Sequence, residues 1–128
     1  MIIPHDQKIH RGGEDSADSH HRMLVVSDGV GSWARRGVNP GLFSKELTRS
    51  ILEEVVSSDD GAKKSAKELL AIGCQRASRI HQGTATVVVL RLLDDMRLES
   101  ANLGDSGYAL FHVDHEADTL EMYYRSNI

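Results

Sequence analysis

Runs of apolar residues predict several strands along the chain. Residues 23–26 are four apolar residues in a row, two of them β-branched, which predicts a strand that is buried on both faces. Residues 84–93 are dense in β-branched side chains and predict a central strand. Three later runs bounded by turn residues predict strands at 97–103, 108–113 and 119–125. Residues 1–10 carry three isoleucines around a proline, so we expect a short edge strand there.

Two segments between these strands have the periodicity of amphipathic helices. Residues 34–38, after Trp33, are expected to form a loop. Asn39 is a suitable N-cap and Pro40 a suitable first residue for the first helix. The apolar stripe of this helix repeats at every fourth position, at Phe43, Leu47, Ile51 and Val55. Ser65 and Glu68 can form a capping box at the start of the second helix, which residues 81–83 end. The order of strands, two helices and strands predicts an α+β fold with antiparallel hairpins.

The second predicted helix contains a glycine and the only cysteine of the chain. Gly73 lies on its apolar face, which predicts a close approach of helix and sheet. Cys74 lies on or next to the same face, so we expect it to pack rather than to react. A lone cysteine allows no internal disulfide and favours a reducing, intracellular compartment.

Length and charge narrow the classes of function. The chain of 128 residues fits one domain. Its formal net charge of -4 argues against nucleic acid as the main partner, because phosphate binding needs a basic patch. The longest apolar stretch, around residues 87–93, is too short to span a bilayer, and no targeting sequence is visible at the N-terminus.

Two acidic turns carry the candidate chemistry. Asp28 follows the strand predicted at 23–26, and a carboxylate there is costly unless a cation compensates it. Hard divalent cations prefer such oxygens, and Gly29 lets its carbonyl approach a ligand. Glu14 and Asp15, after two glycines, form either a solvated loop or a second carboxylate donor that faces Asp28 across a hairpin. The simpler interpretation of Asp28 is a common Asp-Gly turn after a strand.

The residues between these turns, 17–22, are polar and are expected to form a connection rather than a strand. They include His20 and His21. Adjacent histidines point in different directions on a strand, so we interpret both as surface residues and not as ligands.

Four stretches stand out, in this order: PHDQKIHRGGEDS, VVSDGVGSWARRGVNPGLFS, GTATVVVLRL and ANLGDSGY. In this order and spacing they resemble the metal-dependent protein phosphatases of the PPM, or type-2C, class. The resemblance covers residues 4–126 and is strongest to the mitochondrial and plastid subfamily. It implies a single, partial phosphatase domain over residues 1–128. The implied fold is a four-layer α-β-β-α sandwich of two antiparallel sheets, here incomplete at the C-terminal side.

The resemblance also implies an activity and a set of site residues. Members of the class are protein serine/threonine phosphatases that use two Mn²⁺ or Mg²⁺ ions. By resemblance, Asp28 bridges both metals, Gly29 offers its carbonyl, and Glu14 acts on one metal, in part through water. Asp28 and Glu14 are therefore the catalytic candidates, and Asp15 lies in the same acidic motif.

Three further residues carry smaller roles in this comparison. Asp105 matches a position implicated in a third, weaker metal. Arg11 falls near the phosphate-binding arginine of the family, offset in register, and His10 is another candidate for that neighbourhood. The implied partners are phosphoserine and phosphothreonine proteins, and the implied location is the mitochondrion or the plastid.

The class has two further metal-binding aspartates in the second half of its domain, which would begin after residues 125–126. The chain is then a fragment, an incomplete gene model or a degenerate member, and we expect it to be a poor phosphatase by itself. Besides the enzyme, two hypotheses stay open. One is a non-catalytic phosphatase-like module that binds a partner, and the other is an unrelated α+β domain with an acidic turn.

Overall fold

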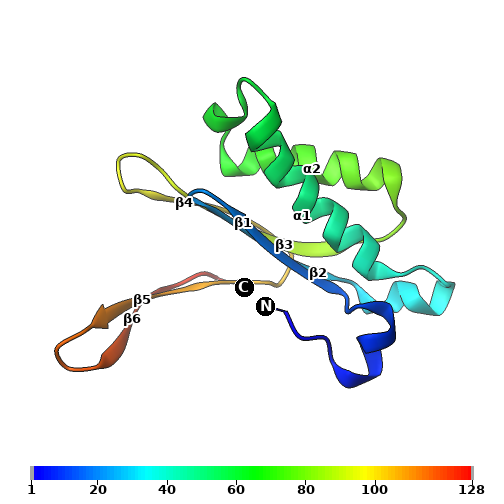
Figure 1. Cartoon of the computed structure of the whole chain (residues 1–128), viewed down its shortest axis with the longest axis horizontal. Coiled ribbons are helices and arrows are strands. Elements are labelled where there is room, and N and C mark those ends of the chain that lie inside the picture. The colour runs from blue at the N-terminus through cyan, green and yellow to red at the C-terminus, as the bar shows by residue number, and fades with distance from the viewer. Residues whose placement is uncertain (1, 128) are drawn as a thin grey trace.

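The computed structural model describes residues 2–127, apart from the side chain of Arg11. These residues form two antiparallel sheets and two long helices (Figure 1). The strands are β1 (Asp15–His20), β2 (Met23–Gly29), β3 (Ala85–Leu92), β4 (Leu98–Leu103), β5 (Ala109–Asp114) and β6 (Thr119–Arg125). The helices are α1 (Pro40–Ser57) and α2 (Ala66–Ile80), with short 3₁₀ helices η1 (Asp6–Arg11), η2 (Gly31–Arg36) and η3 (Gly61–Lys63). The first sheet has the order β1-β2-β3-β4, and β5 and β6 form the second.

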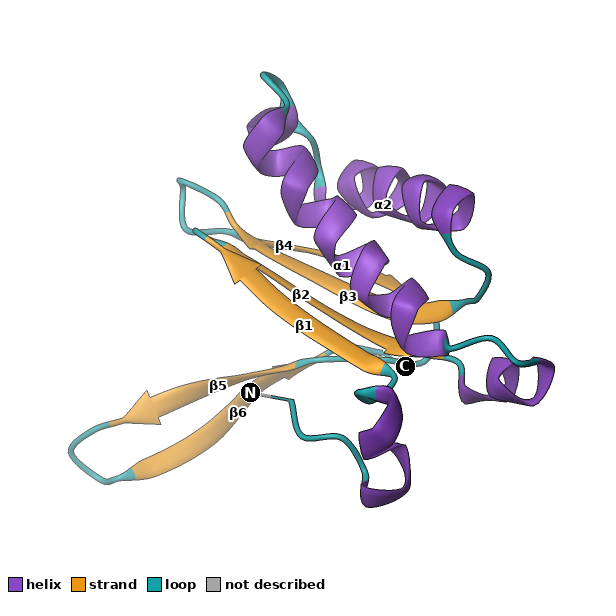
Figure 2. Cartoon of the chain, turned by 45° about the vertical axis from the view of Figure 1, so that its right-hand side comes forward, coloured by secondary structure: helices purple, strands orange, loops and turns teal. Residues whose placement is uncertain are grey.

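Both long helices lie on one face of the four-stranded sheet, and the β5–β6 hairpin lies on the other side (Figure 2). The core between the helices and the sheet contains the fully buried side chains of Val25, Leu47, Ile51, Leu69, Val87 and Val89. This confirms the α+β prediction with two antiparallel sheets. The expected sandwich is present in part, as one helical layer, one large sheet and one hairpin within residues 2–127.

Strand β2 alternates between the two faces of its sheet. Met23 and Val25 are buried against the helices, whereas Leu24 is 42% and Val26 39% exposed. The prediction that this strand is buried on both faces is therefore wrong. Four apolar residues in a row indicate a strand, but the described residues cover the helical face fully and the other face only in part.

The helix ends follow the sequence signals. The Asn39 side chain accepts a hydrogen bond of 3.0 Å from the Gly41 amide, and Pro40 is the first residue of α1. The capping box at α2 is also confirmed, because the Ser65 hydroxyl accepts from the Glu68 amide at 3.2 Å and the Glu68 carboxylate accepts from the Ser65 amide at 2.7 Å.

Helices α1 and α2 touch each other closely at Gly73. A Cβ atom at this position would lie 2.3 Å from Cγ1 of Ile51 on α1. The predicted close approach of Gly73 exists, but its neighbour is the first helix and not the sheet. The two helices lie side by side, α1 over β1 and β2 and α2 over β3 and β4. The same pair of helices is joined by the buried carboxylate of Glu54, which forms ion pairs with Lys64, at 3.1 Å, and with Arg76.

Three local predictions are wrong. No strand forms within residues 2–10, where η1 begins at Asp6 and ends before Gly12 in a left-handed conformation (φ 75°). Residues 17–22 are not a connection, because most of them belong to β1. The segment after Trp33, expected to be a loop, continues η2 as far as Arg36. In each case the residues are polar or the element is short, so no hydrophobic period marks it.

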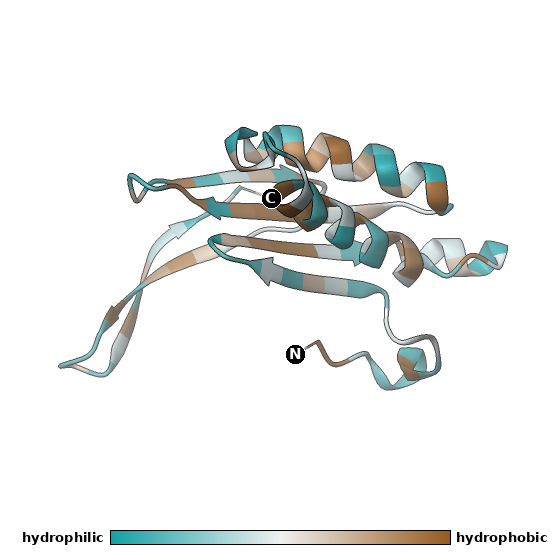
Figure 3. Cartoon of the chain, turned by 45° about the horizontal axis from the view of Figure 1, so that its top comes forward, coloured by the Kyte–Doolittle hydropathy of each residue, from teal (hydrophilic) through white to brown (hydrophobic). Residues whose placement is uncertain are grey.

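The β5–β6 hairpin contains several hydrophobic residues (Figure 3), and many of their side chains are exposed. Phe111 is 52%, Met122 55% and Tyr123 82% exposed. Between the four-stranded sheet and the segment that leads into this hairpin lies a cavity of about 230 Å³, lined in part by Leu24, Val26 and Tyr108. The segment therefore passes beneath the apolar residues that β2 turns away from the helices.

Candidate metal centre

The acidic turns lie at one end of the four-stranded sheet. Asp15 in β1 is the register partner of Asp28 in β2, and Asp28 is in turn the partner of Thr86 in β3. The turn after β4 reaches the same end, because a Cβ atom at Gly104 would lie 2.6 Å from Cγ2 of Thr86. Strand pairing thus places Glu14, Asp15, Asp28 and the 104–105 turn at one end of the four-stranded sheet.

Backbone contacts fix the turn that carries Glu14. The Gly29 amide donates a 3.0 Å hydrogen bond to the carbonyl of Glu14, and the Ser44 hydroxyl of α1 donates to the same carbonyl at 2.5 Å. A Cβ atom at Gly29 would lie 2.7 Å from the carbonyl oxygens of both Glu14 and Pro40. Only glycine fits between these two carbonyls, so Gly29 lets β1, β2 and the start of α1 meet at this point.

Strand β2 is also tied to α1 by a buried polar contact next to Asp28. The Ser27 hydroxyl donates to the carbonyl of Ser44 at 2.9 Å and lies 2.9 Å from the hydroxyl oxygen of Thr48. Ser27 itself is fully buried. Because side chains alternate along a strand, Ser27 pointing towards the helix turns Asp28 to the open face of the sheet.

Asp15 and Asp28 form a pair of like charges across β1 and β2. Burial raises the pKa of Asp28, and the hydrogen bond with Asp15 and the negative charge of Asp15 raise it further. The positive charge of Lys8 acts in the opposite direction. Two carboxylates held this closely favour a shared proton or a shared cation.

Lys8 is the cation that the structure brings to these carboxylates. Its ammonium forms an ion pair with Oε2 of Glu14, whose side chain is only 6% exposed. The hydrogen bond to Glu14 raises the pKa of Lys8, and the charges of Glu14, Asp15 and Asp28 raise it too. Sequence reasoning missed Lys8, because nothing in the spacing of residues 8 and 14 indicates that they meet across the Gly12-Gly13 turn.

The donor chemistry fits a hard divalent cation, although the set of ligands is small. Carboxylate oxygens of Glu14 and Asp28 and the Gly29 carbonyl are the ligand types that Mg²⁺ and Mn²⁺ prefer. The Lys8 ammonium among them indicates that this place attracts positive charge. Within residues 2–127, however, no group of three or more His, Cys, Asp or Glu side chains is arranged to hold a metal ion.

The remaining predicted residues lie outside this group of carboxylates. Asp105 is exposed in the turn after β4, at the same sheet end but not in a cluster with Glu14 and Asp28. The backbone of Arg11 ends η1, and its side chain lies outside the described part of the chain, so the phosphate-binding prediction is untested. His10 is exposed on η1.

His20 and His21 lie at the other end of β1, where His20 pairs with Met23 in register. Their rings are 4.0 Å apart between centroids. His21 is exposed and His20 is partly exposed, so the interpretation of both as surface residues is confirmed.

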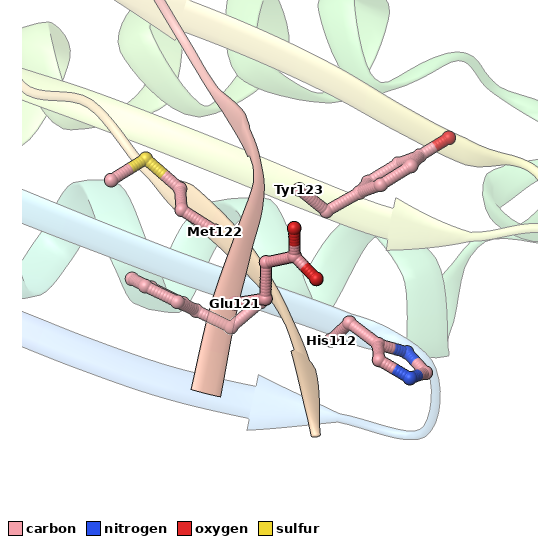
Figure 4. Close-up of a pocket in the computed structure, with 5 residues that line it drawn as sticks. His112, Glu121, Met122 and Tyr123 are labelled. Carbon is pink, nitrogen blue, oxygen red and sulfur yellow. The ribbon is translucent and has the colours of Figure 1, made fainter. Parts of the chain in front are cut away.

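A larger cavity lies outside this site. It has a volume of about 620 Å³ and lies on the β5–β6 hairpin, between residues of both strands. Figure 4 shows His112, Glu121, Met122 and Tyr123 around it, and His112 and Glu121 are register partners. None of the acidic-turn residues lines it, so this cavity gives no support to the metal site.

No described helix is both long enough and apolar enough to cross a membrane.

Comparison with known proteins identifies the class. No family model matches the sequence. Among curated proteins, the probable protein phosphatase 2C 80 of Arabidopsis thaliana is 34% identical over 110 residues, which are 84% of this chain and 26% of that protein. The protein phosphatase PTC7 homolog fig of Drosophila grimshawi is 32% identical over 123 residues, covering 87% of this chain and 39% of that protein.

A solved structure matches the fold. The X-ray structure of the photosystem II phosphatase PBCP superposes with a TM-score of 0.74 at 28% sequence identity, over 99% of this chain and 47% of that one. The chain therefore spans about half the length of this structure, and between a quarter and two fifths of the two relatives above.

The fold and the acidic motifs define a partial sandwich of the metal-dependent phosphatase class. The chain belongs to the protein phosphatase 2C family. The family is generally metal-dependent, which agrees with the hard oxygen donors at the acidic end of the sheet.

Proposed function

We propose that this chain contributes the acidic half-site of a metal-dependent protein serine/threonine phosphatase. The observation that supports this most is the convergence of Asp15, Asp28 and Glu14 at one sheet end, near the ammonium of Lys8. An unrelated domain with a simple Asp-Gly turn would have no need to place like charges opposite each other.

Each residue has a distinct role in this proposal. Asp28 and Glu14 would hold Mn²⁺ or Mg²⁺ through their carboxylates, and the Gly29 carbonyl would add a neutral donor. A bound divalent pair supplies an activated water and neutralises phosphoryl charge. The chain's own contribution is to hold the donors rigidly, through the bonds of Gly29 and Ser44 to the Glu14 carbonyl.

Other roles follow from the resemblance alone. Asp105 would serve a third, weaker metal near the same sheet end. Arg11 would bind the substrate phosphate. The substrates would be phosphoserine and phosphothreonine proteins, and the protein would act in a mitochondrion or plastid. Immunoblotting of organelle and cytosolic fractions tests the location.

The second candidate is a non-catalytic module that binds a phosphoprotein. One observation favours it, because the described residues contain no group of three carboxylate, thiol or imidazole ligands. The two functions differ in their dependence on Asp28. Catalysis requires its carboxylate for metal binding, whereas a binding module tolerates an isosteric amide there.

The experiment measures Mn²⁺ binding by calorimetry and hydrolysis of a phosphothreonine peptide, for this chain and for Asp28→Asn. We expect Mn²⁺ binding that is lost in the variant, and slow turnover because the ligand set is small. Mn²⁺ binding that is unchanged in Asp28→Asn would contradict the metal site. Peptide binding without turnover, equal in both proteins, would instead support the module.

A further inference from the structure

Lys8 is held in place by a locked turn. Its amide donates to the His5 carbonyl at 2.7 Å, and its carbonyl accepts from the Gly13 amide at 3.2 Å. Both bonds belong to η1 and to the Gly12-Gly13 turn that leads directly into Glu14. The backbone therefore folds back so that the Lys8 ammonium contacts the carboxylate of Glu14, six residues further along the chain.

The partner of Lys8 is a buried charge. The Glu14 side chain is 6% exposed, whereas that of Lys8 is 44% exposed. A buried carboxylate is strongly destabilising unless a cation or several donors compensate it. Within the described part of the chain, Lys8 is the cation that forms an ion pair with this carboxylate. Glu14 depends on Lys8, while Lys8 can return to solvent at little cost.

A divalent cation bound directly to Oε2 of Glu14 would need the oxygen that the Lys8 ammonium occupies. The ammonium and the metal would also repel each other at such a separation, more strongly in a partly buried site than in water. The Lys8 ammonium and a metal ion would therefore compete for the Glu14 carboxylate rather than bind to it together.

We propose that the Lys8 ammonium is a tethered counterion of Glu14 that is exchanged for the metal ion when the site is loaded. This inference rests on the proposed metal site. The exchange has two consequences. Lys8 keeps the metal-free site folded by compensating Glu14, and it weakens the apparent affinity for the metal because it must first be displaced.

The test compares Lys8→Met with the wild-type chain, by calorimetric titration with Mn²⁺ and by thermal unfolding in chelator. Methionine keeps most of the length and the apolar character of the lysine stem but removes the charge. We expect Lys8→Met to bind Mn²⁺ about tenfold more tightly, the size of one charge-assisted hydrogen bond. In chelator, we expect the same variant to unfold at a lower temperature than the wild-type chain.

Lys45→Met is the matched control. The Lys45 ammonium lies in the same neighbourhood, 3.4 Å from the Gly12 carbonyl oxygen, but it forms no ion pair with a carboxylate of the described residues. Its removal should leave the Mn²⁺ affinity unchanged. Lys8→Arg keeps the charge and should stay near the wild-type affinity. Lys8→Gln, which removes the charge but keeps a hydrogen-bond donor for Glu14, should also bind Mn²⁺ more tightly and keeps the proposal testable if Lys8→Met folds poorly.

The outcomes separate this proposal from the proposed function. Unchanged or weaker Mn²⁺ binding by Lys8→Met, with binding still lost in Asp28→Asn, would overturn the exchange and leave the metal site standing. Equal tightening in Lys45→Met would also overturn it, because general charge would then be the cause. Absence of Mn²⁺ binding in every variant would overturn both proposals together.

Discussion

Replacing Asp28 by asparagine should stabilise the metal-free protein while it removes a metal ligand. Asp28 and Asp15 are register partners on neighbouring strands, and like charges directly opposite each other destabilise a sheet. Cross-strand pairs of this kind are worth about 0.2–1 kcal/mol. The positive charge of Lys8 offsets part of the repulsion, so we expect the lower half of this range.

The gain should depend on pH with a defined sign. The folded protein raises the pKa of Asp28 above its usual value, so the folded state disfavours the ionised carboxylate. The loss of stability caused by the ionised Asp28 carboxylate is complete above the raised pKa of the folded protein. It disappears as the pH falls below the pKa that Asp28 has in the unfolded chain. Asp28→Asn should therefore raise the melting temperature by roughly 1–4 °C near neutral pH and by nothing in acid.

The assay is thermal unfolding in chelator across this pH range, followed by the same measurement in Mn²⁺. Excess Mn²⁺ should reverse the order, since a ligand stabilises only the protein that binds it. Asp118→Asn is the control, because it removes the same charge from a turn residue. Asp118 has a positive φ of 51°, a backbone conformation that asparagine also adopts readily. A lower melting temperature for Asp28→Asn in chelator, or a gain that persists in acid, would refute the electrostatic reasoning.

Three further predictions concern the helices. Gly73→Ala should lower the free energy of unfolding in urea titrations by about 1 kcal/mol, because overpacking costs about 1–3 kcal/mol and the better helix propensity of alanine returns about 1 kcal/mol. The control Ser78→Ala, on the exposed face of α2, should raise the free energy of unfolding slightly. An equal gain in both variants would contradict the close packing at Gly73. Glu54→Gln should lower the melting temperature at neutral pH but not in acid. The hydrogen bond from Lys64 lowers the pKa of Glu54, so the stabilisation by the ionised Glu54 carboxylate is lost as the pH falls through that pKa. A loss of melting temperature that does not depend on pH would argue against the ion pairs. Cys74 should react slowly with thiol reagents because burial raises its pKa, and rapid labelling at neutral pH would show an exposed thiolate instead.

The helices and the central strand could be predicted because their signals are local. Asn39 and Pro40 mark the start of α1, and Ser65 with Glu68 marks that of α2. Each signal is a contact between residues a few positions apart, so the sequence contains it in full. The β-branched run that became β3 has a similar local origin.

Strand β1 and Lys8 could not be predicted in this way. The β1 sequence DSADSH has no apolar alternation, and the strand exists because β2 offers it backbone partners. The ion pair of Lys8 with Glu14 needs the geometry of η1 and of the glycine turn. The exposure of Leu24 and Val26 depends on which layers cover the sheet, and that is a property of the tertiary structure.

The two pairings of β2 differ in how far apart their partners lie in the chain. Asp15 and Asp28 are joined by one short hairpin. Val25 and Val89, in contrast, are separated in the sequence by both long helices, although their strands are neighbours in the sheet. Long-range pairing has a larger loop-closure entropy cost and sets the pace of folding. We therefore expect the acidic hairpin to close early and the β2–β3 ladder to close late during refolding. Pulsed hydrogen exchange should then protect the β1–β2 amides before those of the β2–β3 ladder, so the candidate metal ligands would meet before the core beneath them is complete.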